Sequence, residues 1–487
     1  MPSHPPMHKT DLHLAIDQGG HASRALVFDG AGTLVAQAMR PVAVTHPQPE
    51  WVEQDPEEVV SSVLDAVGEV LEQLGARAAS VVNAGLATQR SSIVCWDRRD
   101  GAPLSPVISW QDRRAHAWLA QFSPQAEAIR QATGLYLSAH YGASKLRWCL
   151  DNLPAVRIAQ RDGYLACGPL AAFLVFRLTR EHALRVDPAN AARTLLWNLR
   201  NLTWDPWLLG LFGIPADVLP ACVPTRHAYG VLQLPAHAIP LQIVTGDQSA
   251  ALFSDGQPYP DVAYINVGTG AFVQRTAGNY PGHTRRLLSG VVLQEGSELT
   301  YVLEGTVNGA GSALAWWREQ AGLPDIEQQM PQWLQRAEEP PLFINGVSGV
   351  GSPYWAPQVE SHFIGSGEPW QQAVAVIESI VFLLLANIEE FGQLTSPFDS
   401  LRVSGGLTAY DGLCRRLADL SGLPVYRPQV VEATARGTAW LLAGNPASWP
   451  EAELGAWFKP AGNAALRARY QRWRQAMEQA VSPSKTS

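Results

Sequence analysis

The first hydrophobic pattern along the chain is a set of short apolar runs separated by glycine turns. Three such runs, each of strand length, cover residues 12–17, 24–29 and 33–42. Turns rich in glycine join them, at residues 18–21 and 30–32. Runs of this length with such turns between them predict the strands of an antiparallel meander. Asp17 stands where the first of these strands ends.

The next pattern is helical. Asp55 supplies an N-cap side chain, Pro56 takes the first helical position, and Glu58 stands at the capping-box position. Apolar residues then recur on one face from Val59 to Leu74, so the segment predicts an amphipathic helix. Two further strands are predicted at residues 81–88 and 92–97, with Gln89 and Arg90 at the bend between them.

Two later runs each end in a feature that suggests chemistry. The run 241–244 leads through Gly246 into Asp247 and a helix-compatible stretch, which sets a carboxylate near a helix N-terminus. The run 262–267 leads into the turn Gly268-Thr269-Gly270 and then into another strand. A glycine turn of this kind can present backbone N–H groups to phosphate oxygens. Together they suggest a base that deprotonates a hydroxyl beside a nucleotide.

The strand-plus-glycine-turn unit occurs twice, once at Asp17 and once at Gly268, and each opens one half of the chain. We therefore expect two similar domains, residues 1–255 and 256–487, that face each other across a cleft suited to a nucleotide. Further elements of the second half are predicted as helices at 310–321, 371–392, 411–422 and 464–481, the last one polar, and as a strand at 400–403.

Length and composition agree with two globular domains. A chain of 487 residues is too long for one core, and 46% hydrophobic with 16% charged residues leaves no case for disorder. A net charge of -8 argues against nucleic acid as a partner. The longest apolar run, at residues 381–386, is far too short to span a bilayer and predicts a buried helix, so no membrane is expected either.

The ends and the cysteines point to a cytoplasmic protein. Residues 1–10, MPSHPPMHKT, lack the layout of a signal peptide and are expected to fray. The five cysteines are odd in number and widely spaced, so neither a disulfide framework nor a zinc site is indicated.

Several ordered motifs resemble the FGGY family of carbohydrate kinases, and within it the glycerol kinases. They are IDQGGHASRALVFD, HPQPEWVEQDPEEV, GLATQRSSIVCWD, SWQDRR, VTGDQSAALF, NVGTGAF, SPYWAP and SGGLTAYDGLCRRLADLSGLPVYRP. The resemblance covers nearly the whole chain. It implies an α/β fold of two actin-like, ribonuclease-H-like domains, each a mixed sheet flanked by helices, with the active site in the cleft. It also implies ATP and Mg²⁺ as cofactors, a small polyol or sugar as substrate, and a homodimer or homotetramer.

The resemblance assigns roles to residues one by one. Asp247 matches the base that takes the proton from the attacking hydroxyl, and Asp17 matches the carboxylate that holds Mg²⁺ through water. The polyol pocket corresponds to Arg90, Ser91, Trp110, His140, Gln248 and Phe272, together with Asp247. The ATP side corresponds to Arg24, Gly268, Thr269, Gly311, Gly405, Gly406 and Tyr410, with His21 in the first phosphate turn. Taken singly, the aspartates could be cap or turn residues, Arg24 a surface cation, Trp110 a core residue and each glycine a plain turn.

Some positions depart from the glycerol kinase pattern. Ser91 stands where those kinases have a glutamate, and His140 where they have a tyrosine. In the first phosphate turn two threonines and a serine are replaced by Gly20, His21 and Ala22, and on the adenine side Tyr410 and Ala315 replace an asparagine and a glutamine. Losing a charged acceptor for a hydroxyl costs roughly 1.5–3 kcal/mol.

These departures leave the substrate open. Glycerol is the first candidate, but the shorter Ser91 leaves room for a tetritol, pentitol or pentulose. His140 could donate to a hydroxyl or only pack, and His21 could donate to a phosphate or be an exposed turn residue. Two other functions remain as alternatives: a catalytically silent polyol sensor, favoured by the altered phosphate turn, and a phosphohydrolase of the same fold, in which water replaces the polyol.

Overall fold

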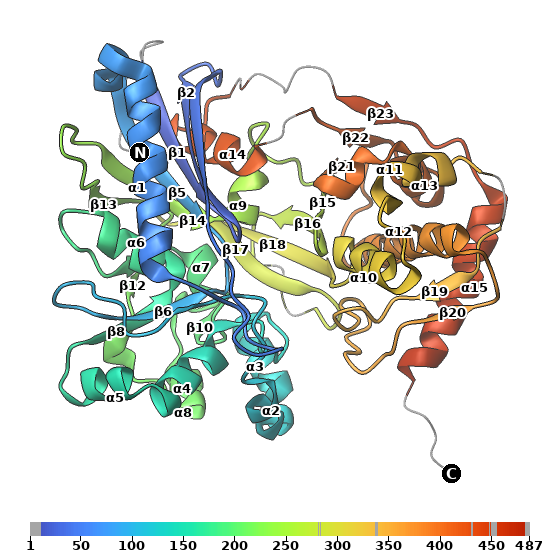
Figure 1. Ribbon diagram of the computed structural model, residues 1–487, viewed down its shortest axis with the longest axis horizontal. Helices are drawn as coiled ribbons and strands as arrows, with labels where there is room; N and C mark the ends of the chain where they lie inside the picture. Colours follow the sequence, from blue (N-terminus) through green and yellow to red (C-terminus); the bar gives the residue numbers. More distant parts are fainter. Residues whose placement is uncertain are drawn as a thin grey trace.

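The computed structural model describes residues 11–280, 282, 284–336, 339–429, 432–447, 449 and 455–482 of the chain. Its elements form two lobes, which Figure 1 shows side by side, the blue-to-green part beside the yellow-to-red part. The expected fraying of residues 1–10 lies outside the described residues. Across the described ranges, no helix combines the length and the apolar character needed to cross a membrane.

The sheet of the first lobe grows from the predicted meander, which is confirmed. β1 pairs antiparallel with β2, and β2 with β3, while β5 and β14 extend the other side of β1 as parallel strands. Over the described residues the order is β13-β14-β5-β1-β2-β3. The strands are β1 (Leu12–Gln18), β2 (Ala22–Asp29), β3 (Leu34–Pro41), β5 (Val81–Thr88), β13 (Arg226–Val231) and β14 (Pro240–Gly246).

Helix α1 (Pro56–Leu74) covers this meander and begins as predicted. The Asp55 carboxylate accepts hydrogen bonds from the amides of Glu57 (2.8 Å) and Glu58 (3.4 Å). The expected capping box is wrong, because the Glu58 carboxylate accepts instead from the amide of Ala43, at 2.9 Å. The start of the helix therefore lacks the return hydrogen bond of a capping box, and Glu58 instead joins the helix to the end of the meander.

The second lobe repeats the plan of the first. β15 and β16 pair antiparallel, β18 takes the place of β3, and β21 and β22 extend β15 as parallel strands. Over the described residues the order is β17-β18-β16-β15-β21-β22-β23. The strands are β15 (Val262–Val267), β16 (Ala271–Ala277), β17 (Leu288–Glu295), β18 (Glu298–Val307), β21 (Ser400–Ser404), β22 (Val425–Arg427) and β23 (Ala456–Phe458). The duplication predicted from the glycine turns is thus a repeat of topology.

Four helices of the second half lie about where they were predicted, namely α10 (Gly311–Ala321), α12 (Pro369–Leu394), α13 (Asp411–Ser421) and α15 (Ala464–Val481). Two further helices, α11 (Ile326–Trp333) and α14 (Ala433–Leu442), were not predicted. The run 381–386 lies inside α12 and is buried, as expected. The final helix α15 is not polar all round, because Tyr470, Trp473 and Met477 pack into the second core.

The β17–β18 hairpin and the helix α14, all from the second half of the chain, pack into the first lobe. Val291 of β17 and Tyr301 of β18 belong to the core of the first lobe. α14 lies against α9 (Asp247–Ala251) and beside β1 and β2, as Figure 1 shows in orange. Gly437 makes this contact possible, since a Cβ there would lie 1.9 Å from the carbonyl oxygen of Ala250. Neither element was assigned this position from the sequence.

A smaller sheet and several helices complete the first lobe below the main sheet. Over the described residues the small sheet has the order β4-β7-β6-β8, with β4 (Glu53–Gln54), β6 (Ile93–Asp97), β7 (Val107–Ile108) and β8 (Leu165–Pro169). The helices around it include α2 (His116–Leu119), α3 (Ala126–Thr133), α4 (Gly142–Asn152), α5 (Pro154–Arg161), α6 (Leu170–Leu178), α7 (Pro188–Ala191) and α8 (Pro206–Phe212).

Candidate active site

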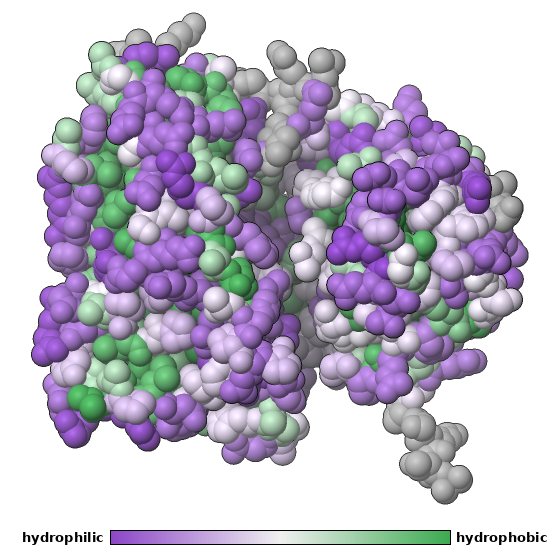
Figure 2. Space-filling model, in the orientation of Figure 1, coloured by the Kyte–Doolittle hydropathy of each residue, from purple (hydrophilic) through white to green (hydrophobic). Residues whose placement is uncertain are grey.

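The two candidate carboxylates lie at the same edge of the first sheet. β1 and β14 both run parallel to β5 on either side of it, and Asp17 lies beside Ala87 while Gly246 lies beside Thr88. Asp247 follows at once, as the first residue of α9. The carboxyl ends of parallel strands are where α/β sheets bind ligands. Figure 2 shows the surface hollowed between the two lobes, in the region where Figure 1 places α9 and β15.

Asp247 is the centre of a polar constellation. Its side chain is 30% exposed, and its Oδ1 accepts from the amide of Gln248 (2.6 Å) and lies 3.9 Å from Arg90 Nε. Arg90 in turn donates through Nη2 to the side-chain oxygen of Gln248. Burial raises the pKa of Asp247, while Arg90 and the Gln248 amide oppose the rise. The result is an accessible carboxylate that is more basic than an ordinary aspartate.

A buried carboxylate from the other half of the chain holds Arg90 in place. Glu304 of β18 accepts from Arg90 Nη2 (3.2 Å), from Arg193, and from the side-chain amide of Gln274 at 2.9 Å. Burial raises the pKa of Glu304, but Arg193 and Arg90 outweigh it and bring the pKa down to about 2. Glu304 and Arg193 were missed from the sequence. The one available signal was a charged residue inside the apolar strand YVLEGTV.

Aromatic and polar side chains form the wall beside Arg90. The rings of Trp110 and His140 lie 5.5 Å apart, and Ser91 follows Arg90 in a left-handed backbone conformation with φ of 66°. Burial, together with Arg113, Lys145, Arg193 and Arg90, holds the pKa of His140 well below its ordinary value. His140 is therefore neutral at pH 7 and offers one donor and one acceptor. Phe272 of β16 is half-buried and pairs in register with Thr306.

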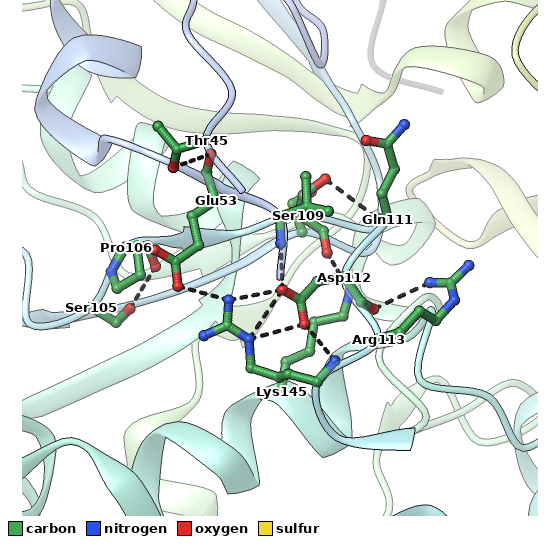
Figure 3. A network of polar contacts seen from close by, with 12 residues as sticks. Thr45, Glu53, Ser105, Pro106, Ser109, Gln111, Asp112, Arg113 and Lys145 are labelled. Atoms are coloured by element: carbon green, nitrogen blue, oxygen red, sulfur yellow. Dashed lines mark hydrogen bonds and ion pairs between the residues drawn. The ribbon is translucent and has the colours of Figure 1, made fainter. Parts of the chain in front are cut away.

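The loop that carries Trp110 is fixed by the buried ionic network of Figure 3. Asp112 accepts from the amide of Val52 (2.7 Å) and pairs with Arg114 (2.8 Å), and Arg114 also reaches Glu53 (2.7 Å). The Arg114 guanidinium lies over the ring of Trp51, 4.0 Å from its centroid. The motifs EWVEQD and SWQDRR therefore meet here, and these contacts anchor the loop.

Asp17 of β1 and Arg24 of β2 lie opposite each other, beside the turn that joins these strands. Their side chains approach to 3.9 Å, and Arg24 also lies 3.6 Å from Glu432. Burial and the negative charge of Asp247 raise the pKa of Asp17 to about 7, although Arg24 opposes the rise. A cation beside such a buried carboxylate would favour its ionised form. This donor set fits Mg²⁺, which keeps several waters and takes one or two carboxylates.

The first turn itself is supported from below. Gln89 donates to the carbonyl of Gly19 and Gln54 to that of Gly20, at 3.3 and 3.0 Å. His21 is exposed, and its carbonyl accepts from the amide of Val42 at 2.9 Å. The turn therefore keeps its shape without the hydroxyls that the resemblance leads one to expect.

The predicted ATP-side residues of the second lobe gather around two glycine turns. The amides of Ala310 and Gly311 donate to the carbonyls of Thr269 and Gly268, which ties the start of α10 to the turn that follows β15. Gly405 has φ of 95°, and a Cβ on it would lie 2.6 Å from the carbonyl of Val267, so only glycine fits. Gly406 faces open space. Tyr410 contributes little surface, because only 9% of it is exposed and it packs in the second core.

Comparison with known proteins gives a consistent result. Residues 12–254 match the N-terminal domain, and residues 263–444 the C-terminal domain, of the FGGY family of carbohydrate kinases. A glycerol kinase of Polaromonas naphthalenivorans is 36% identical over 445 residues, which cover 88% of this chain and 89% of that protein. Another, from Polaromonas sp. strain JS666, is 34% identical over 496 residues, 96% of this chain and 99% of the other.

Solved structures share the fold at lower identity. A Plasmodium falciparum glycerol kinase with ADP superimposes with a TM-score of 0.86 at 23% identity, over 96% of this chain and 98% of that one. A xylulose kinase from Rhodospirillum rubrum superimposes with a TM-score of 0.83 at 20% identity, over 96% and 98%. Both confirm the two-domain fold.

Proposed function

Because this chain belongs to the FGGY family of carbohydrate kinases and is an ATP-dependent kinase of a sugar or polyol, we propose that its substrate is a small polyol, with glycerol as the first candidate. The observation that carries the proposal is the arrangement of Asp247, Arg90 and Gln248 at the end of β14. It combines one basic carboxylate with two hydroxyl-binding side chains, which is what a polyol phosphorylation site needs.

In the proposed reaction Asp247 accepts the proton of the attacking hydroxyl. Its raised pKa makes it a better base than an exposed aspartate, and such a base typically contributes about 10² to 10⁴ in rate. Arg90 and Gln248 bind neighbouring hydroxyls, and neutral His140 can donate to one or accept from one. Trp110 and Phe272 supply apolar surface for the carbon chain, and Ser91 lies at its far end.

The phosphates are proposed to lie between the two glycine turns. Arg24 contacts the phosphates, while Gly268, Thr269, Gly311, Gly405 and Gly406 shape the surface on which ATP rests. Asp17 would hold Mg²⁺ through water, and the bound ion would neutralise charge on the transferred group. His21 is exposed in the turn between β1 and β2, and we propose that it donates to a phosphate.

The experiment measures ADP release with ATP and Mg²⁺ across glycerol, tetritols, pentitols and ketoses. The control is Asp247→Asn. We expect turnover with one substrate class, and kcat lower by about 10² to 10⁴ in the control. The thermal midpoint of Asp247→Asn should not fall, since burial disfavours the charge of this carboxylate in the folded state.

Two results would contradict the proposal. Turnover of the best substrate that survives Asp247→Asn would remove the proposed base. Silence of the wild-type protein across the whole panel, with a polyol still raising its thermal midpoint, would favour the polyol sensor instead.

A further inference from the structure

Lys145 is a buried cation with an unusual set of partners. It lies on α4 with 1% of its surface exposed, and its ammonium donates three hydrogen bonds to backbone carbonyls. The acceptors are Ser91 (2.9 Å), Ser109 (3.0 Å) and His140 (2.7 Å). All three N–H donors of the ammonium are therefore used.

The three acceptors come from the segments that make up the proposed polyol pocket. Ser91 follows Arg90 at the bend after β5, Ser109 precedes Trp110, and His140 faces the ring of Trp110. These segments are far apart in the sequence, and a single side chain joins them. Figure 3 shows Lys145 beneath the loop that carries Ser109 and Asp112.

The position suits lysine and not arginine. Only four of the 36 basic side chains of this protein are lysines, so arginine is its usual cation. An ammonium offers three donors around one point, whereas a guanidinium offers a planar fork. Three carbonyls that converge on one nitrogen match the first geometry.

The charge of Lys145 is balanced by carbonyl dipoles. The neighbouring carboxylate of Asp112 is occupied by Arg114 and by the amide of Val52. Burial, together with Arg113 and Arg114, holds the pKa of Lys145 well below its ordinary value, although Asp112 opposes this. Keeping a cation in such surroundings is costly, and the three hydrogen bonds are the compensation visible here.

The backbone at Ser91 shows why the hydrogen bond from Lys145 is needed. Its φ of 66° is a conformation that L-residues adopt at a cost, and its hydroxyl is buried without a hydrogen-bond partner in the described part of the chain. The Ser91 carbonyl is anchored by Lys145. Without that anchor the bend would relax, and Arg90 next to it would lose its alignment with Gln248 and Asp247.

We propose that Lys145 is a positioning residue of the polyol pocket, which fixes the segments of Ser91, Trp110 and His140 relative to one another. This inference rests on the proposed function for its effect on substrate. It assigns Lys145 an influence on polyol affinity and none on ATP affinity, because its three contacts all lie on the polyol side.

The test compares Lys145→Met with the wild type and with Arg147→Ala. Arg147 lies two residues away on α4, on the surface, and pairs with Asp151. Amide hydrogen exchange followed by mass spectrometry is expected to be at least tenfold faster in Lys145→Met at residues 89–92, 108–111 and 138–141. Exchange at residues 262–277, in the second sheet, should stay the same, and Arg147→Ala should change none of these segments.

The kinetic part of the test separates affinity from turnover. The KM for the best polyol of the panel should rise at least tenfold in Lys145→Met, while the KM for ATP changes less than twofold. Should Lys145→Met fail to fold, Lys145→Arg carries the same test, because it keeps the charge but cannot reach three carbonyls from one point.

The outcomes are distinct. Unchanged exchange at the three segments, a uniform rise over the whole chain, or a fall in kcat with unchanged polyol KM would each overturn the role of Lys145. If the wild-type protein phosphorylates no polyol, and Lys145→Met still loosens the three segments, the positioning role is supported and the proposed function is overturned.

Discussion

At the scale of single residues, the site depends on a carboxylate that the chain supplies from its other half. Glu304 lies on β18, yet it holds Arg90 and Arg193 of the first lobe, and all three side chains are at most 9% exposed. Breaking a buried ion pair by removing one partner leaves an uncompensated charge, which costs far more than the pair is worth as a whole. Glu304 therefore joins the stability of the molecule to the position of Arg90, the arginine proposed to bind substrate.

Glu304→Gln is expected to lower the free energy of unfolding by about 3–5 kcal/mol at pH 7, because two arginines lose their shared counter-charge. Its folded-state pKa, about 2, lies below the ordinary 4.5. Such a group stabilises the fold above about pH 4.5 and loses this contribution as the pH falls towards 2. Urea denaturation between pH 7 and pH 3 should show that the difference in free energy of unfolding between the wild type and Glu304→Gln decreases as the pH falls.

The matched control is Glu298→Gln on the same strand, where the side chain is exposed. It should stay within about 0.5 kcal/mol of the wild type. A gap between wild type and Glu304→Gln that is independent of pH would mean that the ionised carboxylate is not what stabilises the fold.

Ser91 is the residue at which substrate preference can be tested. Its hydroxyl is buried and lacks a partner among the described residues, and the resemblance places a glutamate here in glycerol kinases. Ser91→Glu should therefore raise the ratio of kcat/KM for glycerol to that for a five-carbon polyol by about tenfold or more, since a hydrogen bond to a charged acceptor contributes roughly 1.5–3 kcal/mol. Competition between the two substrates measures the ratio directly.

The expectation for Ser91→Glu fails if both substrates lose kcat/KM by the same factor. In that case Ser91 affects the shape of the pocket and does not select among polyols.

At the scale of elements, α14 is the helix that supports Asp247, the proposed catalytic carboxylate. It lies against α9, whose first residue is Asp247, and Thr434 donates to the Asp247 carbonyl at 3.3 Å. The two helices approach closely at Gly437, where a Cβ would lie 1.9 Å from the carbonyl oxygen of Ala250. The position of Asp247 thus depends on an element that begins 186 residues after it in the sequence, at Ala433.

Gly437→Ala is expected to destabilise the protein by about 1–3 kcal/mol, because the new methyl group would overlap the Ala250 carbonyl. Moving α9 should also lower kcat. Gly68→Ala in α1 is the matched control, since a Cβ there meets nothing within 4 Å, and alanine should stabilise this helix by roughly 0.5–1 kcal/mol. Thermal unfolding of the two variants should move in opposite directions, and equal shifts would exclude steric overlap as the cause.

The elements also show what the sequence could predict. Local patterns located the meander, the start of α1, the strand that leads into Asp247, the glycine turn after β15 and the buried α12. The capping box at Glu58 was wrong because the side chain found an amide of the meander, which no local pattern reveals. The hairpin β17–β18 was not predicted from the sequence, and the core against which it packs is chosen by contacts between residues far apart in the chain.

At the scale of the whole molecule, the two lobes are alike in topology but share their packing. We propose the domain boundary between residues 255 and 256, where the second meander begins. A cluster of buried residues nevertheless joins Ala15 and Ile243 of the first sheet with Val302 of β18 and Trp440 of α14. The candidate site likewise draws on both halves of the chain, since Glu304 from beyond the proposed boundary pairs with Arg90 and Arg193. Resemblance of motifs could assign Arg90 and Asp247, whereas Glu304 and Lys145 required the packed structure.

The shared packing also sets an order of events during synthesis. A chain made from its N-terminus releases β1, β2, β5 and β14 early, but the helix that covers them is α14, near residue 440. The first lobe therefore leaves the ribosome with one face of its sheet uncovered, and it stays so until nearly the whole polypeptide has emerged. Domains that fold as they are made usually finish in sequence. Here the half that is made first is completed only near the end of synthesis.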